Sequence, residues 1–128
     1  MSEGPEGKLT LQVVAMPKDT NPAGDIFGGW LLSQMDLAGG IFCRSITKGR
    51  VVTVAIDSTE FKLPVFIGDT LSCYVSLVKQ GRTSLTVKIE AWVNRDYDET
   101  HIMKATEGTY IFVSVDDNRT PSPIKLDK

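Results

Sequence analysis

The sequence predicts an α+β fold in which an antiparallel β-sheet of about five strands curls around one long central helix. The chain has 128 residues, the usual size of a single domain. Apolar side chains occupy most positions between 25 and 46, as in a packed helix, whereas residues 50–115 carry strand patterns interrupted by short turns. Because one helix cannot cover both faces of a sheet, the other face must be solvated or covered by another subunit.

The charge balance and the N-terminus exclude several classes of partner. The sequence has 14 basic and 16 acidic residues, a net charge of −2, which gives no electrostatic basis for binding nucleic acid or an anionic membrane. No apolar run approaches the ~20 residues that a membrane-spanning helix needs, and residues 1–7 lack the apolar core of a signal peptide. We therefore expect a soluble, cytoplasmic chain.

The chain is predicted to be one domain with short polar ends. Residues 1–7 are expected to be a disordered lead-in, residues 8–117 the folded domain and residues 118–128 a polar tail. The first strand is predicted at residues 8–16, and the Pro, Asp, Asn and Gly residues between 17 and 24 are typical of turns. Asp25 is placed as the N-cap of the helix, and Gly49 as the glycine that ends it.

The helix predicted at residues 25–46 is apolar around most of its circumference, which is typical of a buried helix. At 100° per residue it keeps one polar stripe, formed by Ser33, Asp36, Gly40 and Arg44. Asp36 is the only carboxylate on this stripe. A carboxylate on an apolar helix costs several kcal/mol unless it is paired, hydrated or used in chemistry, so Asp36 is the first candidate for a functional residue.

The rest of the chain is predicted to form four antiparallel strands, at residues 51–64, 70–79, 83–94 and 102–115. Residues 80–82 form a short hairpin turn, and residues 95–100 form a charged loop. The two cysteines, Cys43 and Cys73, lie within apolar runs, which favours buried free thiols over a disulfide or a reactive pair.

Several segments carry a resemblance to a known family. Residues 15–21 read Ala-Met-Pro-Lys-Asp-Thr-Asn, and residues 24–36 read Gly-Asp-Ile-Phe-Gly-Gly-Trp-Leu-Leu-Ser-Gln-Met-Asp. Further matches are Gly-Arg-Val-Val-Thr-Val at 49–54, Gly-Arg-Thr-Ser at 81–84 and Lys-Ala-Thr at 104–106. Over roughly residues 9–117 the chain resembles the hotdog-fold acyl-CoA thioesterases of the bacterial YciA type, which are similar to eukaryotic acyl-CoA thioesterase domains.

This resemblance implies hydrolysis of acyl-CoA to free acid and CoA at a site shared by two subunits, without a metal or organic cofactor. The implied assembly is a homodimer, with three dimers grouped into a hexamer. Asp36 matches the family's catalytic carboxylate, and Gly28 and Gly29 match the helix start whose amides polarise the thioester carbonyl. Asn21 and Asp25 lie on the loop that lines the reacting centre. The segments that hold CoA correspond to two runs of residues: Thr53, Val54, Ala55 and Ile56, and Arg82, Thr83, Ser84 and Leu85.

The residues themselves lead to a similar site. A thioester carbonyl needs a donor for its developing oxyanion and a base or nucleophile, which the first-turn amides at Gly28 and the Asp36 carboxylate can supply. The two positions are about 12 Å apart along a helix that rises 1.5 Å per residue, too far for one carbonyl to touch both. We therefore expect Asp36 of one subunit to face the helix start of another, in an obligate dimer.

Each of these residues also has a purely structural interpretation. Asp36 can instead bond a strand backbone, and Asn21 can form an Asx turn. Paired glycines also permit close packing of a helix on a sheet, a role for which Gly39 and Gly40 are the better candidates. Arg82 is either a phosphate ligand or a solvated turn residue.

Two other functions fit the same pattern. One is a non-catalytic acyl-CoA-binding or sensing module on the same fold, and the other is a structural assembly subunit. The single histidine, His101, is expected in an exposed loop, which argues against a hotdog dehydratase. No metal-ligand spacing is present. Chain-length preference, and the choice between a general-base and an anhydride mechanism, are not readable from the sequence.

Overall fold

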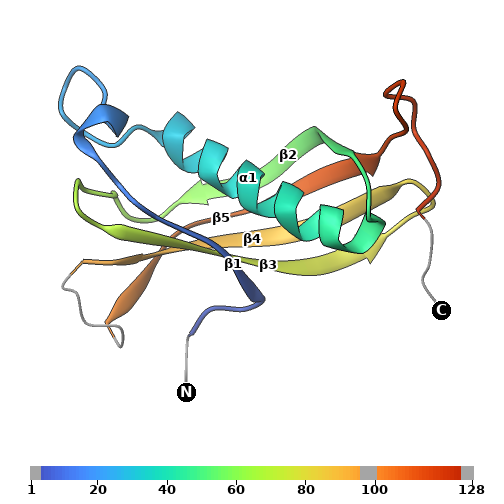
Figure 1. Cartoon of the computed structure of the whole chain (residues 1–128). Helices are drawn as coiled ribbons and strands as arrows, with labels where there is room; N and C mark the ends of the chain where they lie inside the picture. The colour runs from blue at the N-terminus through green and yellow to red at the C-terminus, as the bar shows by residue number, and fades with distance from the viewer. Residues whose placement is uncertain (1–3, 96–100, 125–128) are drawn as a thin grey trace.

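In the computed structural model, which describes residues 4–95 and 101–124, one long helix crosses one face of a five-stranded antiparallel sheet (Figure 1). The elements are β1 (Lys8–Val14), a 3₁₀ turn (Pro17–Asp19), α1 (Gly28–Thr47), β2 (Val51–Phe61), β3 (Thr70–Gln80), β4 (Ser84–Asn94) and β5 (Ile102–Ser114). The α+β class and the five predicted strands are confirmed. Of the loop expected at 95–100, residues 96–100 lie outside the described residues.

The strand order β1-β3-β4-β5-β2 makes β1 and β2 the two edges of the sheet. Helix α1 connects these edges, so it runs over the concave face from one side of the sheet to the other (Figure 1). Strands β3 and β4 form the predicted hairpin, in which the amide of Gly81 donates to the Ser84 carbonyl at 2.8 Å. Among the described strands, β2 pairs only with β5, because it lies at the edge of the sheet.

The core lies between α1 and the concave face of the sheet. On the helix it is formed by Trp30, Leu31, Met35, Ala38, Gly39 and Cys43. Gly39 is required there, since a Cβ at this position would lie 2.6 Å from the Phe112 ring. A Cβ at Gly40 would lie 3.9 Å from the Phe112 ring, which is an ordinary van der Waals contact. The expected close packing of helix on sheet is thus a property of Gly39 alone.

The burial expected all around the helix is wrong for the single chain. Leu37 is 55% exposed and Ile41 is 45% exposed, whereas Met35 and Ala38 are fully buried. The reason is geometric, because one sheet covers one side of the helix. Within residues 4–95 and 101–124, no element covers the exposed apolar residues on its other side.

Both expected helix caps differ from the observed ones. The helix begins at Gly28 with Phe27 as its N-cap, and no side chain caps it; Asp25 lies outside, in the loop closed by Asn21. At the other end Lys48, not Gly49, takes the left-handed conformation (φ 58°) and donates its amide to the Arg44 carbonyl at 2.8 Å. Both cysteines are buried and free, as predicted, and burial raises the pKa of each thiol to about 12.

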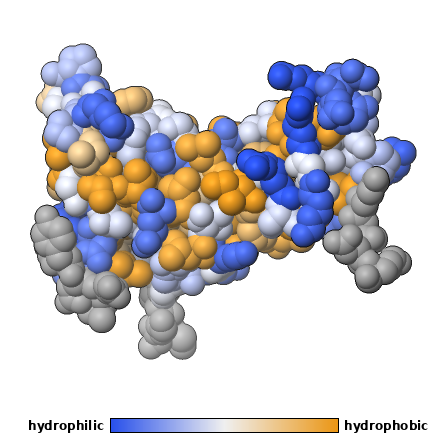
Figure 2. Space-filling model, in the orientation of Figure 1, coloured by the Kyte–Doolittle hydropathy of each residue, from blue (hydrophilic) through white to orange (hydrophobic). Residues whose placement is uncertain are grey.

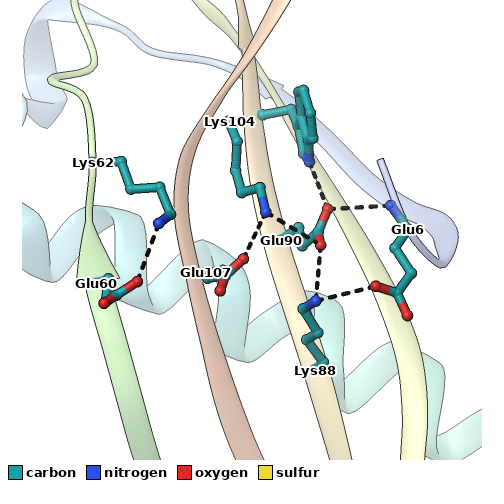
Figure 3. Close-up of polar contacts among 8 residues, drawn as sticks. Glu6, Glu60, Lys62, Lys88, Glu90, Lys104 and Glu107 are labelled. Atoms are coloured by element: carbon teal, nitrogen blue, oxygen red, sulfur yellow. Dashed lines mark hydrogen bonds and ion pairs between the residues drawn. The ribbon is translucent and has the colours of Figure 1, made fainter. Parts of the chain in front are cut away.

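A cluster of charged side chains covers the convex face of the sheet, opposite α1 (Figure 3). Its centre is Glu90, which is only 3% exposed and lies 3.2 Å from Lys88 Nζ and 3.6 Å from Lys104 Nζ. The indole N–H of Trp92 and the backbone N–H of Glu6 also donate to Glu90 Oε1, at 2.9 and 3.2 Å.

The described parts of the lead-in and of the polar tail both contact the folded domain. The described part of the lead-in, residues 4–7, lies against the sheet, because Glu6 bonds Glu90 and a Cβ on Gly7 would meet the Val75 carbonyl at 2.6 Å. In the tail the amide of Ser122 donates to the Ser114 carbonyl at 2.8 Å.

Candidate active site

Helix α1 presents Asp36 to the edge strand β2. The hydroxyl of Thr53 donates a hydrogen bond of 2.5 Å to Asp36 Oδ1, so the acid bonds a strand side chain and not, as the structural alternative had it, a strand backbone. Asp36 is half-buried. Together the two residues line an open cavity of about 230 Å³ with Leu37, Gly40, Ile41, Arg44, Val51 and Phe112. The acid is therefore accessible from the surface.

The position of Thr53 follows from the register of β2. Thr53 pairs with Phe112 of β5, and a shift in register follows between Thr53 and Ala55. Paired residues of an antiparallel ladder point to the same face, so Thr53 shares the helix side of the sheet with the buried Phe112. Within the described part of the chain, Asp36 Oδ2 accepts no hydrogen bond, which leaves this oxygen available to a water molecule or substrate.

A buried tyrosine lies beneath the acid. Tyr110 is fully buried and donates its hydroxyl to the Leu32 carbonyl at 3.1 Å. Burial raises the pKa of Tyr110, and the charge of Asp36 raises it further. The phenol therefore stays protonated at neutral pH.

The start of α1 forms a second cavity with unpaired backbone donors. The backbone amides of Trp30 and Leu31 donate to the Phe27 carbonyl at 3.1 and 3.4 Å and make the first hydrogen bonds of the helix. The amides of Gly28 and Gly29 lie before these bonds, where a helix offers them no carbonyl partner. Gly28 lines a cavity of about 250 Å³ with Ile26, Phe27, Leu31, Phe61, Lys62, Leu63, Pro64 and Val65. Free amides at a helix N-terminus favour an oxygen that carries negative charge.

These two cavities have no residue in common. Gly28 and Asp36 are thus not brought together within one chain, in keeping with the separation of about 12 Å that helix geometry predicts. The carboxylate lies halfway along α1 against β2, whereas the glycine amides lie at its first turn beside Phe61.

Asn21 and Asp25 build the loop that precedes the helix. Asn21 Oδ1 accepts the amides of Ala23 and Asp25 at 3.0 and 3.1 Å, which is the Asx turn that formed the structural alternative. The backbone N–H of Asn21 also donates to the backbone carbonyl of Asp25 at 2.8 Å. Asp25 is exposed and takes part in these bonds through its backbone.

The two expected CoA-binding segments lie at the same end of the sheet, with one strand between them. Thr53 and Leu85 both pair with Phe112 of β5. Val54, Ala55, Ile56 and Arg82 are exposed, and Thr83 and Ser84 are half-buried. Leu85 differs from the expectation, since it is 1% exposed and packs in the core. The single chain therefore presents almost no Leu85 side-chain surface to a ligand.

Sequence reasoning missed two features of this region. The first is the hydrogen bond between Thr53 and Asp36, since the family resemblance places Thr53 only in CoA binding. Which strand residue lies opposite Asp36 depends on the register of β2 in the sheet, which the sequence pattern does not give. The second is a group of cations, Arg44, Lys48 and Arg50, around a cavity at the end of α1. Helical periodicity offered a signal for it, because Arg44 lies on the stripe that carries Asp36.

The described residues contain neither a cluster suited to a metal ion nor a membrane-spanning helix. Among residues 4–95 and 101–124, no three His, Cys, Asp or Glu side chains are grouped so that they could hold a metal ion. No helix in these ranges has the length and hydropathy needed to cross a membrane. His101 is exposed, as predicted.

Comparison with known proteins decides the family. The sequence pattern of the thioesterase superfamily matches residues 23–99, a span that includes α1, Asp36 and Thr53. The chain belongs to the thioesterase superfamily. It is 47% identical over 128 residues to the acyl-CoA thioester hydrolase YciA of Salmonella typhimurium, covering 98% of this chain and 96% of that protein.

Solved structures of this superfamily have the same fold. A hexameric hotdog-fold thioesterase of Campylobacter jejuni superposes with a TM-score of 0.86 at 46% identity, covering 93% of this chain and 91% of that chain. The predicted hotdog fold is confirmed, with its curled sheet around one central helix.

A third, less similar protein of known structure has been solved with substitutions. Two variants of an acyl-CoA hydrolase from Staphylococcus aureus superpose with a TM-score of 0.80 at 25% identity, covering 91% of this chain and 71% of that chain. One carries an aspartate-to-alanine substitution and the other a threonine-to-alanine substitution. The two altered positions are 17 residues apart, the same separation as that of Asp36 and Thr53.

Proposed function

We propose that this chain hydrolyses acyl-CoA thioesters to a free acid and CoA, with Asp36 as general base or nucleophile. The observation that carries the proposal is the hydrogen bond between Thr53 and Asp36 in a cavity open to the surface. Relatives with 47% identity over almost the whole chain are acyl-CoA thioester hydrolases. No metal or organic cofactor has a part in the proposed chemistry.

The proposed reaction uses the two oxygens of Asp36 differently. Thr53 holds Oδ1, so Oδ2 is free to take a proton from a water molecule that attacks the thioester carbonyl. The carbonyl oxygen becomes an oxyanion that accepts hydrogen bonds from the amides of Gly28 and Gly29. The carbon–sulfur bond then breaks, and the proton held by Asp36 passes to the CoA thiolate. In the nucleophilic variant Oδ2 attacks the carbonyl, the carbon–sulfur bond breaks and CoA leaves as the thiolate. Water then hydrolyses the resulting anhydride to the free acid and the Asp36 carboxylate, and the proton released passes to the thiolate.

The proposed site needs two copies of the chain. Asp36 and Gly28 line separate cavities of one chain, so the amides are supplied by the helix start of a second copy. Strand β2 is an edge with exposed Val54 and Ile56, and the uncovered side of α1 carries exposed Leu37 and Ile41. These features support a homodimer as the minimal unit and, given hexameric relatives such as the Campylobacter jejuni protein, a trimer of dimers.

The test is release of free thiol from a panel of acyl-CoA substrates, scored by kcat/KM. Asp36→Asn should lower kcat by ~10²–10⁴, the size of a lost acid–base contribution, while the circular dichroism spectrum and CoA binding are kept. Asp117→Asn, the same change at an exposed site at the end of the domain, should leave turnover unchanged.

Two results would contradict the proposal. Near-wild-type turnover by the Asp36 variant would remove the assigned role of this residue. CoA binding without turnover by the wild-type protein would favour the non-catalytic binding module. Single turnover in ¹⁸O-labelled water distinguishes the two mechanisms, since the label enters the Asp36 carboxylate only through an anhydride.

A further inference from the structure

Three cations surround a large cavity where α1 ends and β2 begins. Arg44, Lys48 and Arg50 line this open space of about 770 Å³ with Ile41, Ser45, Gly49 and Val51. None of the lining residues is a carboxylate. Figure 2 shows hydrophilic residues at this end of the molecule, beyond the apolar middle of the same face.

The three cations lack the ion pairs that neutralise others in this chain. Within residues 4–95 and 101–124, none of the three forms an ion pair with a carboxylate. The described ion pairs engage five other cations: Lys18, Lys62, Lys88, Arg95 and Lys104. Four more described cations, namely Lys8, Lys79, Arg82 and Arg119, also form no ion pair, but they do not line this cavity. An acidic chain with a net charge of −2 thus keeps uncompensated positive charge around one cavity.

The helix itself accounts for only part of this group. Cations near a helix C-terminus interact favourably with its dipole, which suits Arg44 in the last turns and Lys48 at the C-cap. Arg50 lies beyond the end of the helix, where its carbonyl accepts the Val115 amide at 3.0 Å. Neither the dipole nor an ion pair explains the third charge, and all three meet around one space.

This cavity adjoins the cavity of the acid. The two share Ile41, Arg44 and Val51. Arg44 follows Asp36 by two helical turns, which is about 12 Å along the axis. The arm of CoA between its sulfur and its first phosphate has about 12 covalent bonds, equal in length to four residues of extended chain, or about 14 Å. A thioester held at Asp36 would therefore place its phosphates near Arg44.

We infer that Arg44, Lys48 and Arg50 bind the phosphate groups of CoA. This rests on the proposed function, in which acyl-CoA is the substrate. Arginine suits the task because its planar guanidinium binds two phosphate oxygens at once. The assignment differs from the one that the family resemblance implied, since Arg82 does not line this cavity.

Calorimetric titration tests the inference without turnover, using CoA, 3′-dephospho-CoA and pantetheine as probes. Two variants are used: a double variant that combines Arg44→Gln with Arg50→Gln, and the single variant Lys48→Gln. The matched control is Lys18→Gln, a lysine that is 79% exposed and paired with Asp19. We expect the Kd for CoA to rise about tenfold or more in the double variant, because each lost bond joined two charged groups. Binding of pantetheine should be unchanged in every variant.

The 3′-dephospho-CoA titration identifies the phosphate. Weakening for CoA alone assigns the cations to the 3′-phosphate, and equal weakening for both nucleotides assigns them to the diphosphate. Unchanged CoA binding by the double variant would overturn the inference, as would equal weakening for pantetheine. Arg44→Lys should recover part of the affinity, and melting curves establish that each variant is folded.

Kinetics separate this inference from the proposed function. If the wild-type protein releases no thiol but its CoA binding depends on these cations, hydrolysis is wrong and the phosphate site stands. If hydrolysis proceeds and the double variant keeps its KM for acyl-CoA, only the phosphate site is wrong. We expect the double variant to raise KM for acyl-CoA, and to lower kcat/KM for acyl-CoA more than kcat/KM for an acyl-pantetheine, which carries no phosphate.

Discussion

Thr53 connects the edge strand to the acid of the helix, and this contact explains how α1 tolerates a carboxylate. A buried carboxylate without partners would be costly, but Asp36 is half-buried, accepts a charge-assisted bond from Thr53 and lines an open cavity. The bond also fixes the side-chain orientation of Asp36, so that Oδ2 is directed away from the strand hydroxyl.

Replacing Thr53 should impair activity without unfolding the protein. Thr53→Val keeps the side-chain shape but removes the donor to Asp36, and we expect kcat/KM to fall about tenfold, in line with the loss of a hydrogen bond to a charged group. Thr53→Ser keeps the hydroxyl and should stay close to wild type. Steady-state thiol release measures both, and equal rates for the valine and serine variants would argue against a role for the bond.

Helix α1 has one glycine that its packing requires and one that it does not. Gly39 faces Phe112 and Ile89 at distances that leave no space for a methyl group, whereas a Cβ on Gly40 would make an ordinary contact. The neighbouring pair thus separates two effects of alanine, namely steric overlap in the core and the higher helix propensity of alanine.

Alanine substitutions at these two positions should have opposite effects on stability. Gly39→Ala should lower the free energy of unfolding by about 1–3 kcal/mol, because overpacking displaces Phe112. Gly40→Ala should leave it unchanged or raise it by up to ~1 kcal/mol, through the better helix propensity of alanine. Chemical denaturation at equilibrium measures both values. Equal destabilisation by the two variants would mean that α1 does not pack as described.

For the molecule as a whole, the charged cluster on the convex face links stability to pH. Burial raises the pKa of Glu90, but the donors Trp92, Glu6 and Lys88 outweigh it, so the pKa lies below its ordinary value. The hydrogen bond from Lys104 lowers the pKa of Glu107. Unfolded glutamates titrate at about pH 4.3. The stability that both groups supply is complete above that pH and is lost as the pH falls through their lower folded values.

Removing Lys104 should therefore make the protein more sensitive to acid. Lys104→Met deletes the partner of Glu107 at 2.7 Å and one partner of Glu90, and we expect the midpoint of acid unfolding to move to higher pH. At neutral pH the loss should be about 1 kcal/mol, typical of a charged hydrogen bond near the surface. Lys79→Met, at an exposed site on β3, is the control. Acid titration by circular dichroism would reject the idea if both midpoints were the same.

Assembly is the other property of the whole molecule. Strand β2 is an edge with unpaired backbone groups and with Val54 exposed to 54%, the kind of surface that pairs with another chain. Val54→Lys should yield a smaller species in analytical ultracentrifugation and lose thiol release with it, since a second copy completes the proposed site. Val54→Thr should assemble normally. A lysine variant of wild-type mass would place the interface elsewhere.

Element type could be predicted from the sequence because it depends on local pattern. Alternating β-branched residues are enough to specify a half-buried strand, and a long apolar run without strand period is enough to specify α1. The buried free thiols at Cys43 and Cys73 follow from their apolar neighbours in the same way. Asp36 stood out because a lone acid on an apolar stripe needs a physical reason.

Only the folded chain decided what lies opposite each residue. The N-cap is Phe27 and not the predicted Asp25, because the backbone of Asp25 is hydrogen-bonded to Asn21 in the loop before the helix. The pairing of β4 and β2 with β5 sets two further contacts. It buries Leu85 in the core and brings Thr53 into contact with Asp36. Periodicity states which face a side chain points to, but its neighbours come from segments distant in the chain. Those contacts, and the residues shared by the cationic cavity and the cavity of the acid, come together only once the sheet has packed around the helix.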